Sequence, residues 1–472
     1  GAAVIYNDVM ELQQNFNDML DVTSPFTEVI SNALGVVSNA VAFADPNNYA
    51  NVAASASAKG GTESTKFALS GSVTVTDYNN NSSVNVGKFT QLNAGEKLNL
   101  NSANKVEDVN ITGKTQFWKP GAEAKGGLGI GGSVNYQNFD TDSKVVVEEG
   151  ANLSAGDISI GSNSDIFHVG AMLGAGKSDG SAVNGMVTIT DSDSYNNVIV
   201  DTNAVLQAVK SAANQGSINI GATNNTSVTN AIISVSASGA NVGAGIGVAL
   251  NNIDVQNTAQ IVDNDGTEGE DDELTGSISA SDLNVNAETT GLINTVSVAG
   301  GVTSSGENES GGFFDSVKTP FNKIADAQEQ ILGGISKVSN KLQDVLRTMD
   351  LNSSGESSVS GKEVAGTPSF SFAGAGSVSL NLVDDTTKAV IDGANIKLDN
   401  DGTLVVGARD SAFTGAWSGS VGMAVRKGNQ SATSVAVSGA VGVNDIDNEI
   451  TALVKDSTVS GAKDVDVAAV SG

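Results

Sequence analysis

The chain contains one histidine, His168, in the phrase SDIFHVG. A Ser-His-Asp arrangement would need this side chain as its general base. Its apolar neighbours predict an inward or partly buried position on a strand. With one His and no Cys, the chain lacks the ligands that zinc and redox sites commonly use. We assign no catalytic residue and expect a protein that is not an enzyme.

An acidic stretch at residues 263–273, DNDGTEGEDDE, is the best candidate for ion binding. Ca²⁺ prefers clustered oxygen ligands, which Asp263, Asp265 and Glu268 could supply. An EF-hand would place Gly where Glu268 stands, and a solvated loop is the alternative reading of such a charge run. Calcium is the only cofactor that the sequence suggests.

The phrase GAMLGAGKS is similar to a phosphate-binding loop, which requires G-x-x-x-x-G-K-S/T. Gly170 lies six residues before Gly176, where the motif needs five, and no helical pattern follows. We interpret the phrase as a Gly-rich strand. Acidic pairs that could serve a polysaccharide-active enzyme are frequent, but no Lys/Arg-rich groove stands out to hold an anionic sugar.

Composition favours a thin, repetitive β structure. Of 472 residues, 55 are Gly, 5 are Pro and only 4% are aromatic. Thin stacked coils need small and β-branched residues at every level, whereas a thick globular core needs more large ones. The net charge of −29 argues against binding to nucleic acid or to anionic lipid.

A β pattern led by Gly or other small residues recurs six times, and we mark each copy by one valine, the anchor. The anchors are Val73, Val134, Val187, Val248, Val378 and Val441, spaced 61, 53, 61, 130 and 63 residues apart. Residues 11 and 13 positions after each anchor are apolar in all six copies. A spacing of two places both residues on one face of a strand.

Two further apolar positions complete each cycle. The first, 18 or 19 residues after the anchor, is Leu92, Leu153, Leu206, Ile396 or Val459. The second is an alternating pair: Leu98/Leu100, Ile158/Ile160, Ile218/Ile220, Leu283/Val285, Leu404/Val406 and Val465/Val467. Each cycle therefore contains several short strands separated by turns.

A period of about 60 residues fits neither tandem immunoglobulin-like domains nor propeller blades. We predict an all-β fold, a right-handed parallel β-helix (β-solenoid) with α-helical insertions, in which one cycle makes two to three coils. We place the corners at the Asn- and Asp-rich segments 77–81, 191–197, 251–254 and 399–402, because these residues tolerate left-handed backbone.

Two segments break the strand pattern. Residues 1–45 predict a helical hairpin, and residues 303–368 predict a helical insertion with flexible flanks. The cycles then occupy 46–302 and 369–472. The insertion carries an apolar seam with alternating spacings of three and four. We expect this seam to pack against other parts of the protein, with partner binding as the alternative; its largest members include Phe314, Phe321, Ile331, Ile335 and Leu342.

The closing phrases DISIGSNSD and DVDVAAVSG resemble filamentous-haemagglutinin-type repeats. AGAGSVSLN and GAGIGVALNN, with helical insertions between cycles, look most like the giant leukotoxin-family filamentous adhesins of anaerobic Gram-negative bacteria. The resemblance covers most of residues 50–472. It implies a parent protein that is exported across the outer membrane and is displayed or released as a long fibre. Relatives of this kind include adhesins and a cytotoxin.

These observations predict a structural and adhesive segment of a giant exported surface protein that attaches to host or neighbouring cells. A segment of a secreted leukotoxin-like cytotoxin is the first alternative, and a polysaccharide-active β-helix enzyme is the second. The expected location is the bacterial cell surface or the medium, and the expected partner is a receptor on a cell surface. The segment reads as an excerpt of a longer chain, and we expect a monomeric rod without membrane contact.

Overall fold

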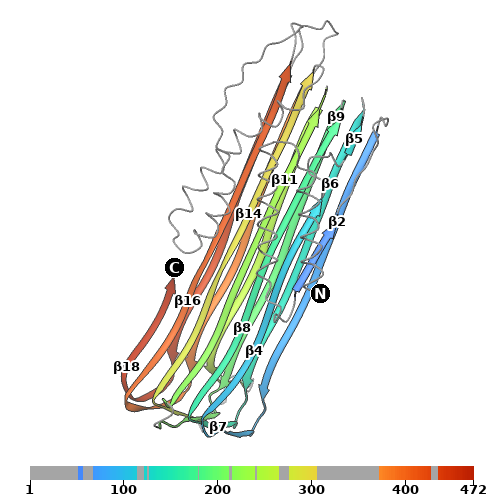
Figure 1. Cartoon of the computed structure of the whole chain (residues 1–472). Helices are drawn as coiled ribbons and strands as arrows, with labels where there is room; N and C mark the ends of the chain where they lie inside the picture. Colours follow the sequence, from blue (N-terminus) through green and yellow to red (C-terminus); the bar gives the residue numbers. More distant parts are fainter. Residues whose placement is uncertain are drawn as a thin grey trace.

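A computed structural model describes ten ranges of the chain: residues 51–56, 67–113, 122–124, 127–178, 180–211, 215–239, 242–264, 276–305, 371–426 and 434–472. Within these ranges the chain forms parallel β-strands arranged as a flattened solenoid of two facing sheets (Figure 1). The all-β parallel solenoid is thus confirmed. Both segments expected to be helical lie essentially outside the described residues.

The six-stranded sheet contains one long strand from each coil, in the order β17-β15-β12-β9-β6-β2. Its strands are β2 (Phe67–Val86), β6 (Leu128–Val147), β9 (Ser181–Asp201), β12 (Val242–Val262), β15 (Ser371–Asp392) and β17 (Ser434–Lys455).

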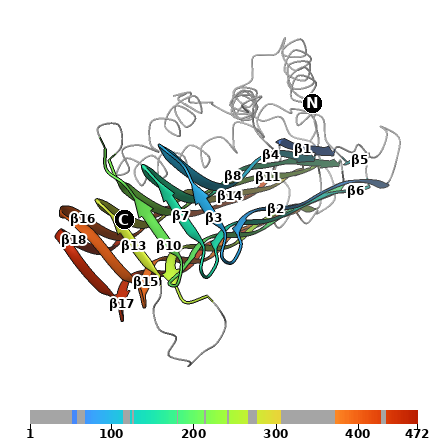
Figure 2. The same cartoon turned by 90° about the horizontal axis from the view of Figure 1, so that it is seen from below.

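The twelve-stranded sheet supplies the opposite face and the bend that joins the two faces (Figure 2). Its long strands are β4 (Lys97–Gly113), β8 (Asp157–Ser178), β11 (Ser217–Ser238), β14 (Asp282–Ser305), β16 (Asn395–Arg426) and β18 (Thr458–Ser471). Short strands make the corner: β3 (Gln91–Asn93), β7 (Asn152–Ala155), β10 (Val205–Ala208) and β13 (Ser277–Ala280). Two more short strands, β1 (Asn51–Ala56) and β5 (Ala122–Ala124), pair with β4 and β8.

The register confirms the repeat read from the sequence. Val73 pairs with Val134, and the other anchors follow in one unbroken row. Val248 pairs directly with Val378, so the two anchors lie on neighbouring coils. The long interval between them therefore contains one coil and an insertion. Each cycle makes one coil: a long strand, a corner strand and a second long strand. The prediction of two to three coils per cycle was wrong, because polar residues that suggested turns continue the strands.

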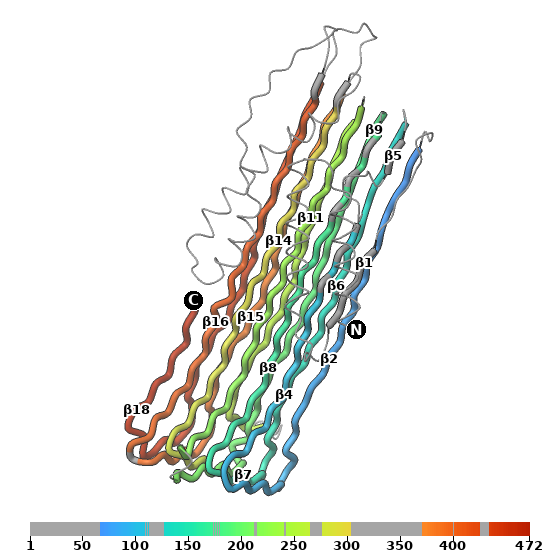
Figure 3. Tube along the Cα trace, in the orientation of Figure 1, coloured from blue at the N-terminus to red at the C-terminus, as the bar shows by residue number. Residues whose placement is uncertain are grey.

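The described coils form a slab that is longer along its strands than along the stacking direction (Figure 3). At about 3.3 Å per residue the 20 residues of β2 extend about 66 Å, whereas six coils stacked about 4.8 Å apart span about 24 Å. Each added coil therefore lengthens the molecule only slightly, and a long rod would require many more coils.

The apolar core is concentrated next to the corner. The apolar positions predicted for this part of the cycle lie here, including the buried corner row of Leu153, Leu206, Ile278 and Ile396. Ile278 was not predicted, because the acidic stretch before it lengthens that corner beyond the spacing of the other cycles. In-register stacking of such rows removes apolar surface from water at every coil.

Three of the four predicted Asn- and Asp-rich corners were wrong, because residues 77–81, 191–197 and 251–254 lie within long strands. Residues 399–402 do lie at a bend, between the part of β16 that stacks on the corner strand β13 and the part that stacks on β14, where the register shifts. Left-handed backbone occurs instead beside the apolar pairs, as at Gly150 (φ 67°) and Gly393 (φ 72°). Glycine suits this conformation because it lacks a Cβ. The polar residues tolerate long strands because they alternate between solvent and a polar interior.

Candidate functional site

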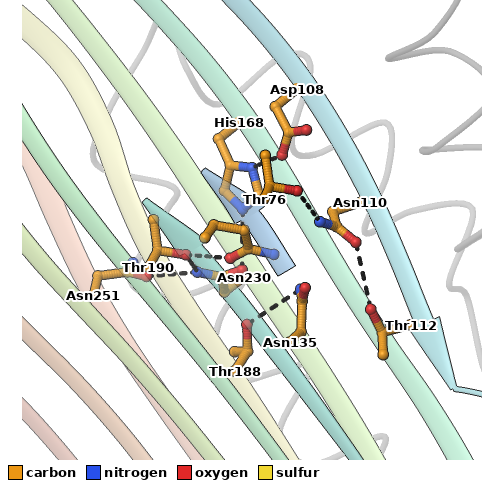
Figure 4. A network of polar contacts seen from close by, with 11 residues as sticks. Thr76, Asp108, Asn110, Thr112, Asn135, His168, Thr188, Thr190, Asn230 and Asn251 are labelled. Atoms are coloured by element: carbon orange, nitrogen blue, oxygen red, sulfur yellow. Dashed lines mark hydrogen bonds and ion pairs between the residues drawn. The ribbon is translucent and has the colours of Figure 1, made fainter. Parts of the chain in front are cut away.

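Beyond the corner, the space between the two sheets is lined mainly by polar side chains. Ser, Thr, Asn and Gln occupy many inward positions and are buried, among them Gln137, Thr190, Asn230 and Asn251. A buried polar group without a partner is costly, so each row requires hydrogen bonds from the neighbouring coil or the facing sheet. The candidate site is this interior, centred on His168 (Figure 4).

His168 lies on β8 with no exposed surface, which agrees with the inward or partly buried position predicted for it. Its Nδ1 is 2.6 Å from Oδ2 of Asp108 on β4, and its Nε2 is 3.3 Å from Oδ1 of Asn230 on β11. The ring also lies beside Phe139, with 5.2 Å between ring centroids. The contact with Asp108 forms because His168 and Asp108 are paired in register on the adjacent strands β8 and β4.

The His168–Asp108 pair has two of the three members of a hydrolytic triad. In such a triad the other imidazole nitrogen faces a nucleophilic hydroxyl. Here that nitrogen faces the amide oxygen of Asn230, which is not a nucleophile. Both members are fully buried. The geometry therefore suits a structural ion pair or strong hydrogen bond that ties three adjacent coils together.

An asparagine row continues from this pair along the solenoid axis. The Asn230 amide donates to Oγ1 of Thr190 (2.7 Å) and to Oδ1 of Asn251 (2.6 Å). Asn251 donates to Oδ1 of Asn381 (3.0 Å), which donates to Oδ1 of Asn444 (2.8 Å). Amide groups suit this role because each carries a donor and an acceptor. The row hydrogen-bonds one coil to the next.

A second polar seam runs closer to the corner. The seam joins Ser82, Ser102, Ser143, Ser162, Asn196, Asn257, Thr289, Thr387 and Asp385 through successive side-chain contacts. It crosses several times from one sheet to the other and so links the sheets as well as the coils. Its last member is a carboxyl group.

Asp385 on β15 and Asp410 on β16 are the acidic members of this interior near the last coil. Asp385 accepts from Thr387 Oγ1 at 3.1 Å, and Asp410 accepts from the Asn448 amide at 2.6 Å. Burial, and then the charge of Asp410, raises the pKa of Asp385 to about 7. Burial also raises the pKa of Asp410. The pair suits proton-dependent stability because like charges in a poorly solvated space oppose each other.

The calcium candidate is described only in part. Asp263 directly follows β12, whereas Asp265 and Glu268 lie outside the described residues. Near Asp263 the sequence reading missed Asp201, which accepts from the backbone N–H of Asn264 at 3.1 Å. Burial raises the pKa of Asp201, and Asp263 adds to the effect. Within the described ranges no three His, Cys, Asp or Glu side chains are arranged to hold a metal ion, so calcium binding stays a prediction.

The Gly-rich phrase resembling a phosphate-binding loop lies on β8, which continues as a strand to Ser178. Gly170, Gly174 and Gly176 face the interior, where a Cβ at Gly174 would collide with the Met186 side chain. Close packing accounts for these glycines, and the interpretation as a strand is confirmed.

The proposed partner-binding residues of the helical seam all lie outside the described part of the chain: Phe314, Phe321, Ile331, Ile335 and Leu342. In the part that is described, no helix has the length and apolar character needed to cross a membrane.

The polar interior was the main feature that the sequence reading missed. The signal was present as polar residues at every second position, such as Ser192, Ser194 and Asn196 on β9. Alternation of this kind identifies a strand but not which of its faces is inside.

No protein-family model, curated protein or solved structure matches the chain.

Proposed function

We propose that this chain is a structural and adhesive segment of an exported bacterial surface protein, one that presents a β surface to host or neighbouring cells. The observation that supports the proposal most strongly is the in-register stacking of six coils along both long faces, with a register shift only at the bend between β16 and β18 among the pairs described. Repetitive stacking of this kind gives a stiff body in which each coil contacts only its neighbours.

The interior chemistry supports the same role. In rows such as Asn251–Asn381–Asn444, side-chain hydrogen bonds repeat from one coil to the next. Such ladders resist sliding of one coil past another because every shift would leave buried amides without partners. A stiff scaffold of this kind can hold a binding surface away from a cell.

The outer surface is acidic beside its apolar rows. Asp140, Asp193, Asp254, Asp384 and Asp447 form one row across the outer face of the six-stranded sheet. A regular row of carboxylates suits recognition of a basic protein surface rather than of phosphate groups. We therefore propose a proteinaceous receptor on the target cell.

The test is incubation of the fluorescently labelled chain with mammalian leukocytes, with flow cytometry of surface binding and of uptake of an impermeant dye in the same cells. We expect saturable binding, displaced by unlabelled chain, without dye uptake. Dye uptake would support the leukotoxin-like alternative instead, and absence of both signals would contradict an adhesive role for this segment.

Two matched variants test whether binding depends on the acidic row. Asp193→Asn and Asp254→Asn together neutralise part of the acidic row and should weaken binding. Asp165→Asn changes a carboxylate on the opposite sheet, where it accepts from Asn225, and should leave binding unchanged. Equal loss in both variants would contradict recognition by the acidic row.

A further inference from the structure

The anchors, which gave the strongest repeat signal in the sequence, face outward. Val73 is 66% exposed, and the anchor row runs across the outer face of the six-stranded sheet. The adjacent row is also apolar: Val75, Tyr136, Ile189, Leu250, Leu380 and Val443. Large contiguous apolar surfaces on soluble proteins commonly mark interaction sites.

A glycine row lies beside the anchors, two residues earlier on each strand. It consists of Gly71, Gly132, Gly185, Gly376 and Gly439, with Ile246 as its one larger member. On the other side of it, Leu69, Ile130, Val183 and Val437 continue the apolar surface. The glycines therefore form a shallow channel between apolar rows, interrupted on β12 by the exposed side chain of Ile246.

Within the described residues, no contact explains most of these glycines. A Cβ added at Gly185, Gly376 or Gly439 would meet no atom within 4 Å, and none of the five has positive φ. Glycine in the interior of a strand weakens it and commonly marks close approach by another molecule. The glycine row thus points independently to an external partner.

We propose that this face binds the same face of a second copy of the chain, with the anchor row of each copy seated in the glycine channel of the other. The anchor row forms a ridge next to the glycine channel. A two-fold axis that lies between these two rows and runs parallel to them places the ridge of each copy over the channel of the other. An interface of this kind is self-complementary, as a two-fold dimer requires.

The area is sufficient for a reversible dimer. The axis between the two rows maps the Leu69 row onto the Val75 row, so the apolar surface that the copies share spans about 20 Å along the strands at roughly 3.3 Å per residue, and about 24 Å across six strands at roughly 4.8 Å spacing. The product is about 480 Å² per copy and about 960 Å² for both. Interfaces below about 1,200 Å² are typical of weak, transient association, which agrees with a monomer–dimer equilibrium.

The acidic row selects the orientation. A two-fold axis along the strands would place the Asp193 and Asp254 row of one copy against that of the other. An axis parallel to the glycine and anchor rows, between them, reverses the strand direction and moves the two acidic rows to opposite edges of the interface. Because like charges repel at close range, the second arrangement is favoured.

Sedimentation velocity of the whole chain tests the pairing. We expect a monomer–dimer equilibrium, and we expect the double variant Gly185→Val/Gly376→Val to raise the dimer dissociation constant at least about tenfold while circular dichroism shows the fold retained. Gln256→Val, which adds an exposed apolar residue on the same sheet outside the channel, should leave the constant unchanged. A wild-type chain that stays monomeric at about 100 µM, or glycine variants that dimerise equally well, would overturn the proposal.

A distance measurement between spin labels tests how the two copies are oriented in the dimer. The chain has no cysteine, so Gln256→Cys gives a single site for a spin label. With the axis between the glycine row and the anchor row, the two labels lie about nine residue steps on either side of it, or about 60 Å apart at roughly 3.3 Å per residue. Pulsed electron paramagnetic resonance giving a separation near 20 Å would refute this arrangement.

Discussion

The corner third and the remaining two thirds of each coil bury opposite kinds of side chain. At the corner, Leu153 and Leu206 face inward; farther along the same coils, polar residues such as Thr190 and Asn230 face inward while Val187 faces outward. The comparison shows that one strand can follow two hydrophobic patterns. Apolar burial dominates the first region, whereas hydrogen-bonded rows and two smaller apolar clusters fill the second.

The largest expected effect is at the corner. Ile391→Asp should lower the free energy of unfolding by about 4 kcal/mol or more, because it places an unpaired carboxylate in a fully buried apolar row. Urea denaturation followed by circular dichroism measures the change. Ile391→Val, which retains an apolar side chain, should cost about 1 kcal/mol. Similar losses for both variants would mean that the row is not tightly packed.

The polar region should respond to loss of a hydrogen-bonding group. Asn251→Ala leaves partners on Asn230 and Asn381 unsatisfied and should lower the free energy of unfolding by about 2 kcal/mol. The neighbouring Asn252→Ala removes only an exposed contact to Asp191 and should have little effect. The same urea titration distinguishes the two, and a neutral Asn251→Ala would contradict a stabilising role for the asparagine row.

The free energy of unfolding should also depend on pH, because the polar interior contains the buried carboxyl group of Asp385. The pKa of Asp385 is raised to about 7 in the folded chain, against about 3.9 for an unfolded Asp. Between these values the folded state binds more protons, so stability falls as pH rises from about 4 to about 7. Relative to Asp385→Asn, the wild-type chain should lose about 2 to 3 kcal/mol of stability between pH 5 and pH 8.

The control for the pH effect is Asp447→Asn, which changes an exposed carboxylate on β17. This variant should keep the pH dependence of the wild-type chain in urea titrations. An Asp385→Asn chain with unchanged pH dependence would contradict the assignment to Asp385.

The smallest effect compares two valines on β9. Val198→Thr places a hydroxyl in the buried apolar row and should cost about 1 to 2 kcal/mol. Val187→Thr changes the partly exposed outer face and should change stability of the monomer by no more than about 0.5 kcal/mol. Thermal unfolding at low protein concentration measures both. Equal effects would show that the two faces of β9 are equally buried.

Much of the fold follows from sequence alone. Two-residue spacing of apolar positions identified the strands, and the distances between repeats predicted the register later seen in the pairs Val73–Val134 and Leu92–Leu153. The number of coils per cycle could not be derived in the same way. Segments such as 191–197 contain residues that favour turns, and only burial between two sheets turns them into strand.

The candidate site was harder to predict for the same reason. His168 could be placed inward from its neighbours, but its partners Asp108 and Asn230 are 60 and 62 residues away in sequence. They meet because the coil length is close to 60 residues, and the contact depends on which face of each strand is inside.

The sequence by itself determined the repeat, the strand periodicity and the acidic charge, because these are local or additive properties of the chain. Only the tertiary structure decided that polar rows lie inside and the valine anchors outside. An alternating pattern defines two faces without distinguishing them, and the choice depends on how many buried amides and hydroxyls the neighbouring coils and the facing sheet can satisfy.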